Sequence, residues 1–428
     1  MEICVIGAGL SGLAAALELS KDNNIILLEK ENYLGGMASS YKIKWDKKIY
    51  RISKTYHHIL KGDETTIDFI KKFGLYSKFH KKKVKQGFIY RHRIHGFSTP
   101  LEILKFPISL IDKIKLAKLI LFSSKNENWN NLKNVSAKEW IIKKAGRKNY
   151  DVFFKRLIYN KFHESGEKIS APWFGTRFFK ESSSFMGKMG WLEGGIESLI
   201  EGFVDRILRN GAIIEKNVNI ESIQNTKEGC RIIYKRNNVK KRLIVDKVIS
   251  TIPPENFIRI AEGISENTRR ELKKIKYLSA ICLAVGTKKN FDACYWNNVL
   301  DKDMPFSVVF KHSALYEDSS PQGKSIFFLN TYLKSNESLW KKSDKYIVNL
   351  YLKSINKVIH NFSKHVEWYR LYRLKYAEAI YSLDFKNPPI KDGNIYFAGI
   401  YRIYPKIRNM ASAIESGIEA ARALMSSS

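Results

Sequence analysis

Cysteine is scarce in this chain of 428 residues, which has four, at Cys4, Cys230, Cys282 and Cys294. No two of them form a C-x-x-C pair, and no histidine clusters near them. This scatter excludes a disulfide framework and a cysteine-based zinc site, so we expect no bound metal. Isolated thiols of this kind are typical of a reduced compartment, and we therefore expect a cytoplasmic protein.

Long apolar runs are also missing. No segment reaches the roughly 18 continuous apolar residues that a membrane-spanning helix needs. The first residues run directly into a buried-strand pattern, without the basic region and cleavage site of a signal peptide. Hydrophobic residues nevertheless make up 44% of the chain, which is enough to build cores. The length indicates two domains, or one large fold with a cap.

Acidic residues are few beside basic ones, with 42 Asp and Glu against 74 Lys and Arg and a net charge of +32. An anionic partner, such as a phosphate group, an acidic membrane surface or nucleic acid, would explain this excess. A Lys-biased composition without functional meaning would explain it equally well. Nucleic acid is not expected as a partner, because zinc-finger, RNP and basic-aromatic motifs are missing.

A strand–turn–helix–strand pattern opens the chain. The apolar run Ile3–Ile6 predicts a buried parallel strand, residues 7–12 follow as GxGxxG, and residues 13–19 predict a helix. Residues 25–28 predict a second buried strand, which ends at Glu29, 22 residues after the first glycine. A carboxylate at this place can accept hydrogen bonds from a ribose diol. The arrangement therefore predicts a dinucleotide site in a Rossmann-type α/β domain.

The glycine motif has a mechanical reason at each position. Gly7 allows a tight turn, Gly9 lets the backbone approach a pyrophosphate, and Gly12 lets the helix pack closely on the strand. The helix N-terminus, at Leu10 and Ser11, offers unpaired N–H groups and the positive end of the helix dipole. We expect this turn to hold the phosphates of the cofactor.

A second glycine pair indicates which dinucleotide is bound. Glu29 and Lys30 are followed by the run Gly35-Gly36-Met37-Ala38, which resembles the extended motif of the flavin-dependent amine oxidase superfamily. The resemblance implies that FAD is the cofactor and that the glycine pair passes its pyrophosphate and ribityl chain. That family usually has Arg after the second glycine, where this chain has Met37.

Three later segments resemble the same superfamily. Residues 190–223 match its Gly-Gly, helix and adenine-strand pattern, and residues 246–254 match the strand and Pro turn that lead back to the substrate domain. Residues 393–417 match the last strand and a closing helix whose N-terminus points at the flavin. The positions that the resemblance places at the cofactor are Ile220, Thr251, Gly399, Met410 and Ala411.

These matches divide the chain into two discontinuous domains. Residues 1–56, 188–255 and 385–428 are predicted to form the FAD-binding domain. Residues 57–187 and 256–384 are predicted to form the substrate domain. The predicted fold class is α/β, with a Rossmann-type FAD-binding domain and an inserted, mixed α+β substrate domain.

Two histidines and a basic loop are the candidates for chemistry, because flavin itself carries the redox reaction and few side chains are needed. His57 and His58 follow the Gly-Gly segment, and either can be a general base, a phosphate contact or a structural residue. Tyr404, Lys406 and Arg408 lie between the last strand and the last helix, where α/β sheets bind ligands. This loop can stabilise reduced flavin or hold a diphosphate, or it can simply be solvated.

Segments around these candidates resemble a prokaryotic branch described as protoporphyrinogen oxidase-like, which is also similar to UDP-galactopyranose mutase. The resemblance is carried by residues 56–60, 73–75, 295–297, 305–306 and 403–409. Relatives commonly have an acidic pair after Tyr-Pro and an acid after the late glycine, whereas this chain has Lys406-Ile407 and Gly399-Ile400.

Residues 101–122 predict a basic amphipathic helix. Leu110, Ile111 and Ile114 approximate one helical face, lysines lie to the sides, and Pro107 would break or begin a helix. Such a helix can lie on an anionic membrane surface. It can equally be a core helix of the substrate domain with its lysines in solvent.

The sequence thus predicts an FAD-dependent oxidoreductase. We expect it to remove two hydrogens or a hydride from an organic substrate, a small molecule or a lipid-linked one, that is lipidic or bears phosphate. A non-redox sugar mutase of the UDP-galactopyranose mutase kind is the alternative, and an FAD-binding scaffold without turnover is a third hypothesis. The expected location is the cytoplasm, with peripheral contact to the inner face of an anionic membrane left open.

Overall fold

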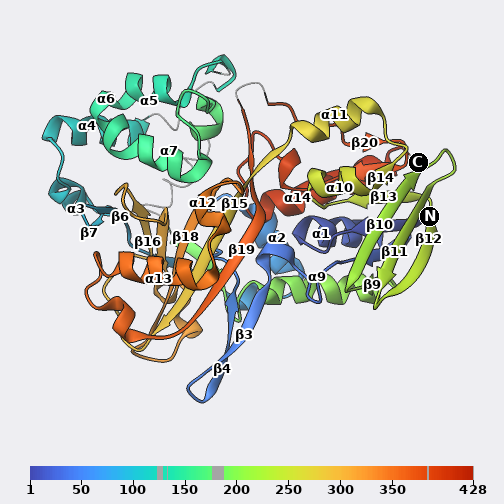
Figure 1. Cartoon of the computed structure of the whole chain (residues 1–428), viewed down its shortest axis with the longest axis horizontal. Helices are drawn as coiled ribbons and strands as arrows, with labels where there is room; N and C mark the ends of the chain where they lie inside the picture. The colour runs from blue at the N-terminus through green and yellow to red at the C-terminus, as the bar shows by residue number, and fades with distance from the viewer. Residues whose placement is uncertain (123–128, 133, 176–187, 383–384, 428) are drawn as a thin grey trace.

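The computed structural model describes residues 1–122, 129–132, 134–175, 188–382 and 385–427, which form two sheet-based halves (Figure 1). The first half contains a six-stranded sheet of order β20-β21-β13-β1-β2-β9, parallel except for β20. Its strands are β1 (Glu2–Ile6), β2 (Asn24–Leu28), β9 (Ile213–Glu215), β13 (Lys247–Ser250), β20 (Lys391–Asp392) and β21 (Ile395–Phe397).

Both faces of this sheet are covered, which explains why its strands are apolar almost without interruption. Ile3 and Val5 of β1 pack against helices on one face, and Cys4 and Ile6 join a cluster with a second sheet on the other. The helices on the first face are α1 (Leu10–Leu19), α9 (Glu197–Arg209) and α14 (Met410–Met425).

The second sheet has four strands in the order β12-β11-β10-β14. Its strands and the helices that follow in the chain are β10 (Val218–Asn225), β11 (Cys230–Arg236), β12 (Val239–Val245), α10 (Pro254–Ile260), β14 (Ala261–Glu262) and α11 (Glu266–Lys274). β14 lies beyond residue 255, where the sequence puts the end of an FAD-domain segment, and it pairs with β10. The division into domains stays a prediction.

The other half is built on a seven-stranded sheet of order β19-β15-β18-β17-β16-β6-β7, antiparallel except for the pair β16 and β6. One of its faces packs on a helix and the other on a hairpin. These elements are β3 (Ser40–Trp45), β4 (Lys48–Ser53), β6 (Gln86–Tyr90), β7 (Arg93–Gly96), β15 (Lys276–Thr287), β16 (Trp296–Val299), β17 (Val308–Lys311), β18 (Ser325–Leu333), α13 (Asp344–Ile355) and β19 (Val366–Ile380).

A helical group lies beyond β6 and β7, at the upper left of Figure 1. It contains α3 (Pro100–Lys105), α4 (Leu110–Phe122), α5 (Ala137–Ala145), α6 (Arg147–Asn149), a π-helix (Tyr150–Phe154) and α7 (Lys155–Phe162). The helix predicted over 101–122 is thus two helices, interrupted around Pro107, because proline cannot donate an N–H to a helix interior. The remaining elements include α2 (Glu64–Lys72), β5 (Phe79–Lys83), β8 (Lys188–Leu192) and α12 (Ser338–Lys341).

The predicted fold class is confirmed, since GxGxxG joins β1 to α1 in a parallel sheet and the chain carries a second, mixed α and β half. All four cysteines are buried and free. Within the described part of the chain, no helix is long and apolar enough to cross a membrane. The same residues contain no group of His, Cys, Asp and Glu placed to hold a metal ion.

Candidate active site

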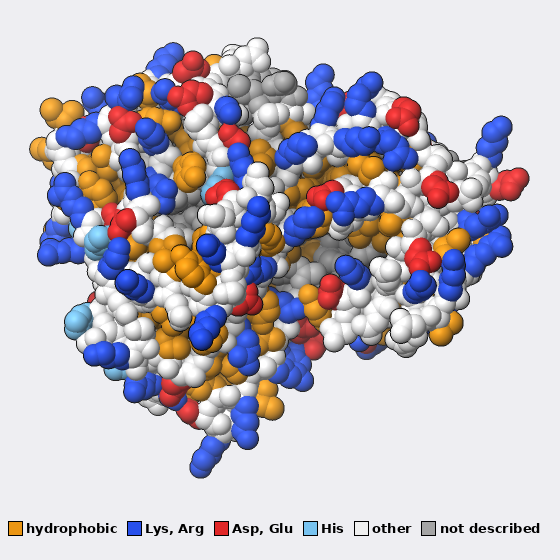
Figure 2. All heavy atoms as spheres, viewed as in Figure 1, with side chains coloured by type: hydrophobic (Ala, Val, Ile, Leu, Met, Phe, Trp, Pro, Cys, Tyr) orange, Lys and Arg blue, Asp and Glu red, His pale blue; other side chains and the backbone are white. Residues whose placement is uncertain are grey.

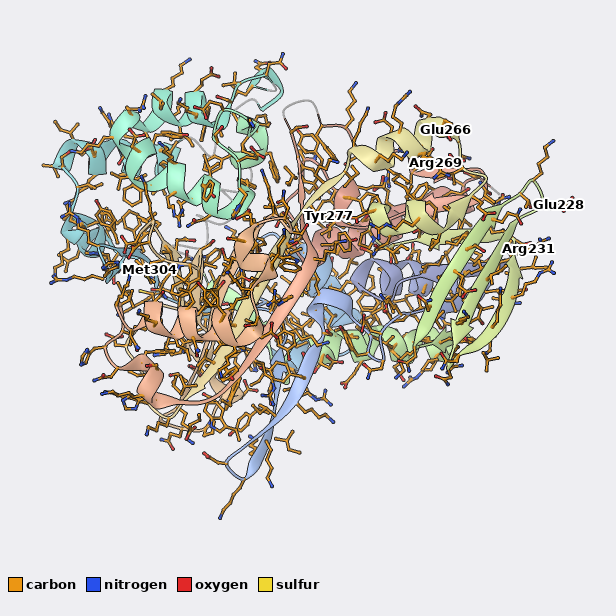
Figure 3. All side chains as sticks on the ribbon, viewed as in Figure 1. Glu228, Arg231, Glu266, Arg269, Tyr277 and Met304 are labelled. Atoms are coloured by element: carbon orange, nitrogen blue, oxygen red, sulfur yellow. The ribbon has the colours of Figure 1, made fainter. Side chains whose placement is uncertain are left out.

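A cavity of about 370 Å³ lies where the two halves meet. The first half lines it with the glycine turn after β1, with the segment 35–38 and with the start of α14. The second half lines it with residues of β15, β18 and β19. Tyr277 of β15 is one of these, and Figure 3 shows it between the halves. Segments from the beginning, the middle and the end of the chain therefore share one site.

The two glycine segments touch through their backbones on one side of this cavity. Gly35 N–H donates to the Ala8 carbonyl oxygen at 2.7 Å, and Gly9 and Gly35 form a parallel bridge. The Glu29 carboxylate, at the end of β2, accepts the N–H groups of Ala8 at 2.7 Å and Glu31 at 2.8 Å. A carboxylate has about four lone-pair sites, so Glu29 can still accept the hydroxyls of a ribose.

Gly12 and Gly9 have opposite surroundings. A Cβ on Gly12 would lie 1.8 Å from the carbonyl oxygen of Gly7, so only glycine lets α1 pack this closely on the turn. A Cβ on Gly9 would meet nothing within 4 Å, because Gly9 borders the cavity. This open space adjoins the N-terminus of α1, whose first turn has no acidic side chain. The turn therefore fits the diphosphate of a dinucleotide.

The start of α14 is tied to the same place. Ser11 Oγ donates to the Ala413 carbonyl oxygen at 2.8 Å and so joins the first turns of α1 and α14. Asn409 caps α14 by accepting the Ser412 N–H at 2.8 Å, and its amide donates to the buried Asp63 carboxylate at 2.7 Å. Two helix N-termini thus border one cavity, which suits a cofactor that bears negative charge.

Most of the predicted cofactor residues line this cavity. These are Gly7, Gly9, Leu10, Ser11, Glu29, Gly35, Gly36, Met37, Ala38, Thr251, Gly399 and Met410. Four others do not: Gly12 lies at the helix–turn contact, Lys30 is exposed, Ile220 packs on the core beside a bulge of β10, and Ala411 is buried in α14. The individual assignments stay predictions.

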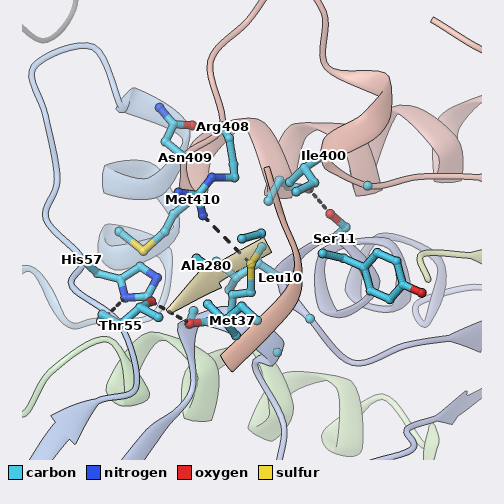
Figure 4. A pocket seen from close by; sticks show the side chains of 18 of the residues that line it. Leu10, Ser11, Met37, Thr55, His57, Ala280, Ile400, Arg408, Asn409 and Met410 are labelled. Carbon is cyan, nitrogen blue, oxygen red and sulfur yellow. Dashed lines mark hydrogen bonds between the residues drawn. The ribbon is translucent and has the colours of Figure 1, made fainter. Parts of the chain in front are cut away.

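Both predicted histidines line the cavity. His57 Nδ1 lies 3.0 Å from the Thr55 carbonyl oxygen (Figure 4). A carbonyl can only accept, so Nδ1 carries the proton and Nε2 is left as an acceptor. Burial lowers the pKa of His57 to about 4, so its imidazole is neutral at pH 7. His58 Nδ1 lies 3.0 Å from the Tyr295 hydroxyl, and its ring packs against Trp296.

Arg408 lines the cavity and belongs to a cluster of buried charges. Its Nε donates to Glu378 at 2.9 Å, and its Nη2 donates to the Tyr332 hydroxyl at 2.7 Å. Lys161 Nζ donates to the same Glu378 oxygen at 2.6 Å and lies 4.0 Å from the centre of the Tyr332 ring. Burial raises the pKa of Tyr332, but the charges of Arg408 and Lys161 outweigh burial and lower that pKa below its usual value.

The structure does not bring Tyr404 and Lys406 into the cavity. Lys406 Nζ pairs with Glu415 of α14 at 2.8 Å, and 62% of the lysine side chain is exposed. Tyr404 packs against the rings of Tyr381 and Phe385. Of the three side chains that the sequence selects in this loop, the one that faces the cavity is Arg408.

Sequence reasoning missed the wall that the second half contributes. Its residues are Tyr56, Tyr277, Ala280, Trp296, Asn330, Tyr332, Leu374, Tyr376 and Ala377. All but Tyr56 lie on strands whose neighbours come from distant parts of the chain. For example, β15 pairs with both β18 and β19. No local motif marks such positions, because strand pairing decides which side chains face the cavity.

A smaller cavity of about 110 Å³ adjoins the larger one, and the two share Tyr56, Trp296 and Tyr332 as lining residues. Its other walls are half apolar and half polar. Its remaining lining residues are Gln86, Phe88, Leu157, Asn160, Lys161, Phe162, Phe174, Asn298, Ser307 and Val308. The active-site space thus extends from the cofactor side into the helical group around α7.

Comparison with known proteins decides the family. The model of the flavin containing amine oxidoreductases matches residues 10–425. The chain belongs to the flavin-containing amine oxidoreductase family. This flavin-containing amine oxidoreductase is also similar to the 1-hydroxycarotenoid 3,4-desaturase of Flavobacterium sp. (strain P99-3), at 22% identity over 365 residues. That match covers 73% of this chain and 70% of the desaturase.

Solved structures have the same fold as this flavin-containing amine oxidoreductase. A protein of Exiguobacterium sp. 255-15 assigned as a protoporphyrinogen oxidase has a TM-score of 0.77 at 16% identity, over 100% of this chain and 99% of its own. Putrescine oxidase with bound putrescine has a TM-score of 0.76 at 14% identity, with the same coverage. Cyclohexylamine oxidase of Brevibacterium oxydans IH-35A has a TM-score of 0.69 at 13% identity.

Membership of this family confirms three predictions: the superfamily resemblance, FAD as the cofactor, and an oxidoreductase activity. The residues present fit FAD, since the space beside Gly9 is open, Glu29 has free acceptor capacity, and two helix N-termini border the cavity. The chain is an FAD-dependent oxidoreductase of the amine oxidase and desaturase family.

Proposed function

We propose that this flavin-containing amine oxidoreductase removes two hydrogens from a lipidic or phosphate-bearing organic substrate in the cavity between its halves. The observation that carries the proposal is the composition of the cavity walls. The glycine segments and helix N-termini on one side suit FAD, and the side chains of β15, β18 and β19 on the other suit a substrate. When bound, FAD supplies the acceptor for two electrons and hydrogen.

The chain's own residues position the substrate and exclude water. His57 is neutral, is held by Thr55 through Nδ1–H, and presents Nε2 as an acceptor in the cavity wall. We assign it to orient a substrate N–H or O–H by accepting a hydrogen bond at Nε2. Leu374, Ala377 and Tyr277 give this wall an apolar surface that excludes water.

Two observations support a lipidic substrate. The smaller cavity beside Tyr332 has aromatic and aliphatic side chains on part of its wall, and it continues the larger one. The desaturase of Flavobacterium that resembles this chain acts on a carotenoid, as its name says. An apolar chain in the smaller cavity would place its end beside the cofactor.

We further propose that α3 and α4 contact an anionic membrane surface. Leu116 and Leu119 of α4 are buried in the core, yet the apolar side chains on its other side are not. The exposed ones are Leu101, Leu104, Leu110, Ile111 and Ile114, each at least 49% exposed, with Lys105, Lys115 and Lys118 exposed among them. Figure 2 shows hydrophobic side chains among Lys and Arg at the upper left, where Figure 1 places α4.

This pattern favours a membrane over a purely internal role for these helices, because a core helix would bury its apolar residues on one side. The lysines are placed to approach anionic headgroups while the apolar side chains enter the interface. Contact at this surface would bring the protein to the inner face of a membrane, where a lipidic substrate is available.

Anaerobic titration of the purified, FAD-loaded protein tests the main proposal. Candidate polyenes, lipid amines and their phosphorylated analogues are added without oxygen, and flavin absorbance is followed. Bleaching by a candidate, with a product two hydrogens lighter by mass spectrometry, is expected. A sugar mutase would instead need added reductant and would convert its substrate to an isomer of equal mass, and a scaffold would show neither change.

A further inference from the structure

Two cations face the two cavities from one buried cluster. Among the described residues that line the larger cavity, Arg408 is the one lysine or arginine. Among those that line the smaller cavity, the one lysine or arginine is Lys161. Both donate to Oε2 of Glu378, whose side chain is 2% exposed and lines neither cavity. The carboxylate therefore lies behind the cations, and the positive charges are presented to the cavities.

Both cations have N–H groups that can still donate to a ligand. Arg408 directs Nε to Glu378 and Nη2 to Tyr332, but Nη1 lies 4.0 Å from the sulfur of Met37, which is a weak acceptor (Figure 4). Lys161 has three N–H donors, and among the described residues it donates to one acceptor, the Glu378 carboxylate. Since two cations share one carboxylate, positive charge is in excess around the Tyr332 hydroxyl.

We propose that Arg408 and Lys161 bind an anionic oxygen group of the substrate, a carboxylate or a phosphate, where the two cavities adjoin. This rests on the proposed function, because it names the substrate class for the same site. The apolar walls around Phe88 and Phe162 hold the hydrocarbon part of such a molecule. The charges of the same two cations lower the pKa of Tyr332, which agrees with a cluster that stabilises negative charge on an oxygen at this place.

Calorimetric titration of the FAD-loaded protein with three six-carbon ligands tests this inference. Hexanoate, hexyl phosphate and hexan-1-ol share one hydrocarbon chain and differ in the charge of the head group. At least one anion is expected to bind about tenfold or more tightly than the alcohol, and the tighter anion identifies the group that is recognised. Neither anion exceeding hexan-1-ol in affinity would overturn the inference.

Charge variants give effects of opposite sign. Lys161→Met removes a cation and should weaken binding of the preferred anion about tenfold, whereas Glu378→Gln removes the shared carboxylate and should strengthen it. The double variant Lys161→Met with Glu378→Gln restores the original excess charge, so its affinity should return toward that of the unmodified protein. Damage to the fold would weaken binding in all three variants, and the exposed Lys341→Met is the matched control, with no change expected.

Flavin absorbance, recorded on every sample, separates a failure of the proposed function from a failure of this inference. A protein that retains FAD but is bleached by no candidate in the anaerobic titration contradicts the proposed function, while calorimetry still reports whether anions are preferred. A protein that retains FAD and is bleached by a neutral substrate, but shows no anion preference, contradicts this inference alone.

Discussion

At the scale of single residues, Gly9 and Gly12 have different roles within one turn. Gly12 allows the first turn of α1 to approach the Gly7 carbonyl, so it serves packing. Gly9 borders the cavity with open space beside its Cα, so it serves ligand approach. The same motif therefore contains one position where a side chain would break the fold and one where it would only fill the site.

Gly9→Val should abolish FAD retention with little loss of stability, because the added side chain enters the cavity and touches no protein atom at its Cβ. Gly12→Val should destabilise the fold by about 3 kcal/mol or more, since its Cβ would overlap a backbone oxygen. The ratio of flavin to protein absorbance and the urea midpoint measure the two effects. Equal loss of stability in both variants would contradict this separation.

The residue scale also shows where prediction from sequence ends. Arg408 could be selected, because it lies between the last strand and the closing helix of a recognisable motif. Its partners Glu378, Lys161 and Tyr332 could not, since they come from β19, α7 and β18 and no spacing connects them. The protonated nitrogen of His57 is likewise decided by a carbonyl two residues away that only the folded backbone places.

At the scale of elements, α4 carries apolar side chains on two sides. Leu116 and Leu119 pack into the core, and Ile111 and Ile114 are 65% and 49% exposed. The sequence leaves open a core helix or a helix on an anionic membrane surface; the structure buries one side of α4 in the core, and membrane contact by its other side stays a proposal. A helix that is apolar on both sides needs a second apolar environment, and an anionic interface provides one.

Replacing Ile111 and Ile114 together by Glu should reduce binding to vesicles that contain phosphatidylserine by about tenfold or more, because apolar insertion is lost and negative charge is added. Lys115→Glu with Lys118→Glu should mainly remove the salt-sensitive part of binding, since exposed charges are screened by salt. Pelleting with vesicles at low and high salt measures both effects.

The control for this experiment lies on β12, where Val239 and Ile244 are 60% and 59% exposed. Replacing this pair by Glu makes the same chemical change on a different surface and should leave vesicle binding nearly unchanged. Equal effects at both surfaces, or no binding by the unmodified protein, would refute membrane contact through α3 and α4.

The elements differ in how far sequence could predict them. The strands and helices around the glycine motif, such as β1, α1 and β2, follow from a local pattern of apolar run, turn and helix. The seven-stranded sheet follows from no such pattern, because β16 lies between β17 and β6, which is about 200 residues earlier in the chain. Long-range pairing of this kind leaves little signal in any short window.

At the scale of the whole molecule, neutral buried histidines couple stability to pH. Burial lowers the pKa of His312 to about 3 and that of His57 to about 4, against an ordinary value of 6.5. At pH values between these lowered pKa values and 6.5, the unfolded chain binds more protons than the folded one. The stabilising contribution is therefore fully present above about pH 6.5 and is lost as the pH falls toward 4.

The free energy of unfolding should consequently fall by about 5 kcal/mol between pH 7 and pH 4.5 through these two groups, because one pKa unit corresponds to about 1.4 kcal/mol. His312→Phe should flatten this dependence, because phenylalanine keeps a ring against Tyr316, where the two rings now stack at 4.2 Å, and takes no proton. Urea unfolding at several pH values measures the slope. An unchanged slope in the variant would show that His312 does not titrate on unfolding.

The sheet around β1 has a consequence for how the protein is made. β1 begins at Glu2, whereas β21 of the same sheet ends at Phe397, and α14, which completes the cavity, follows it. A ribosome that adds about 5 to 20 residues per second would therefore need about 20 to 80 seconds before the last strand exists. Until then the nascent chain has no finished flavin site, so bound FAD can stabilise the protein only after α14 has been made.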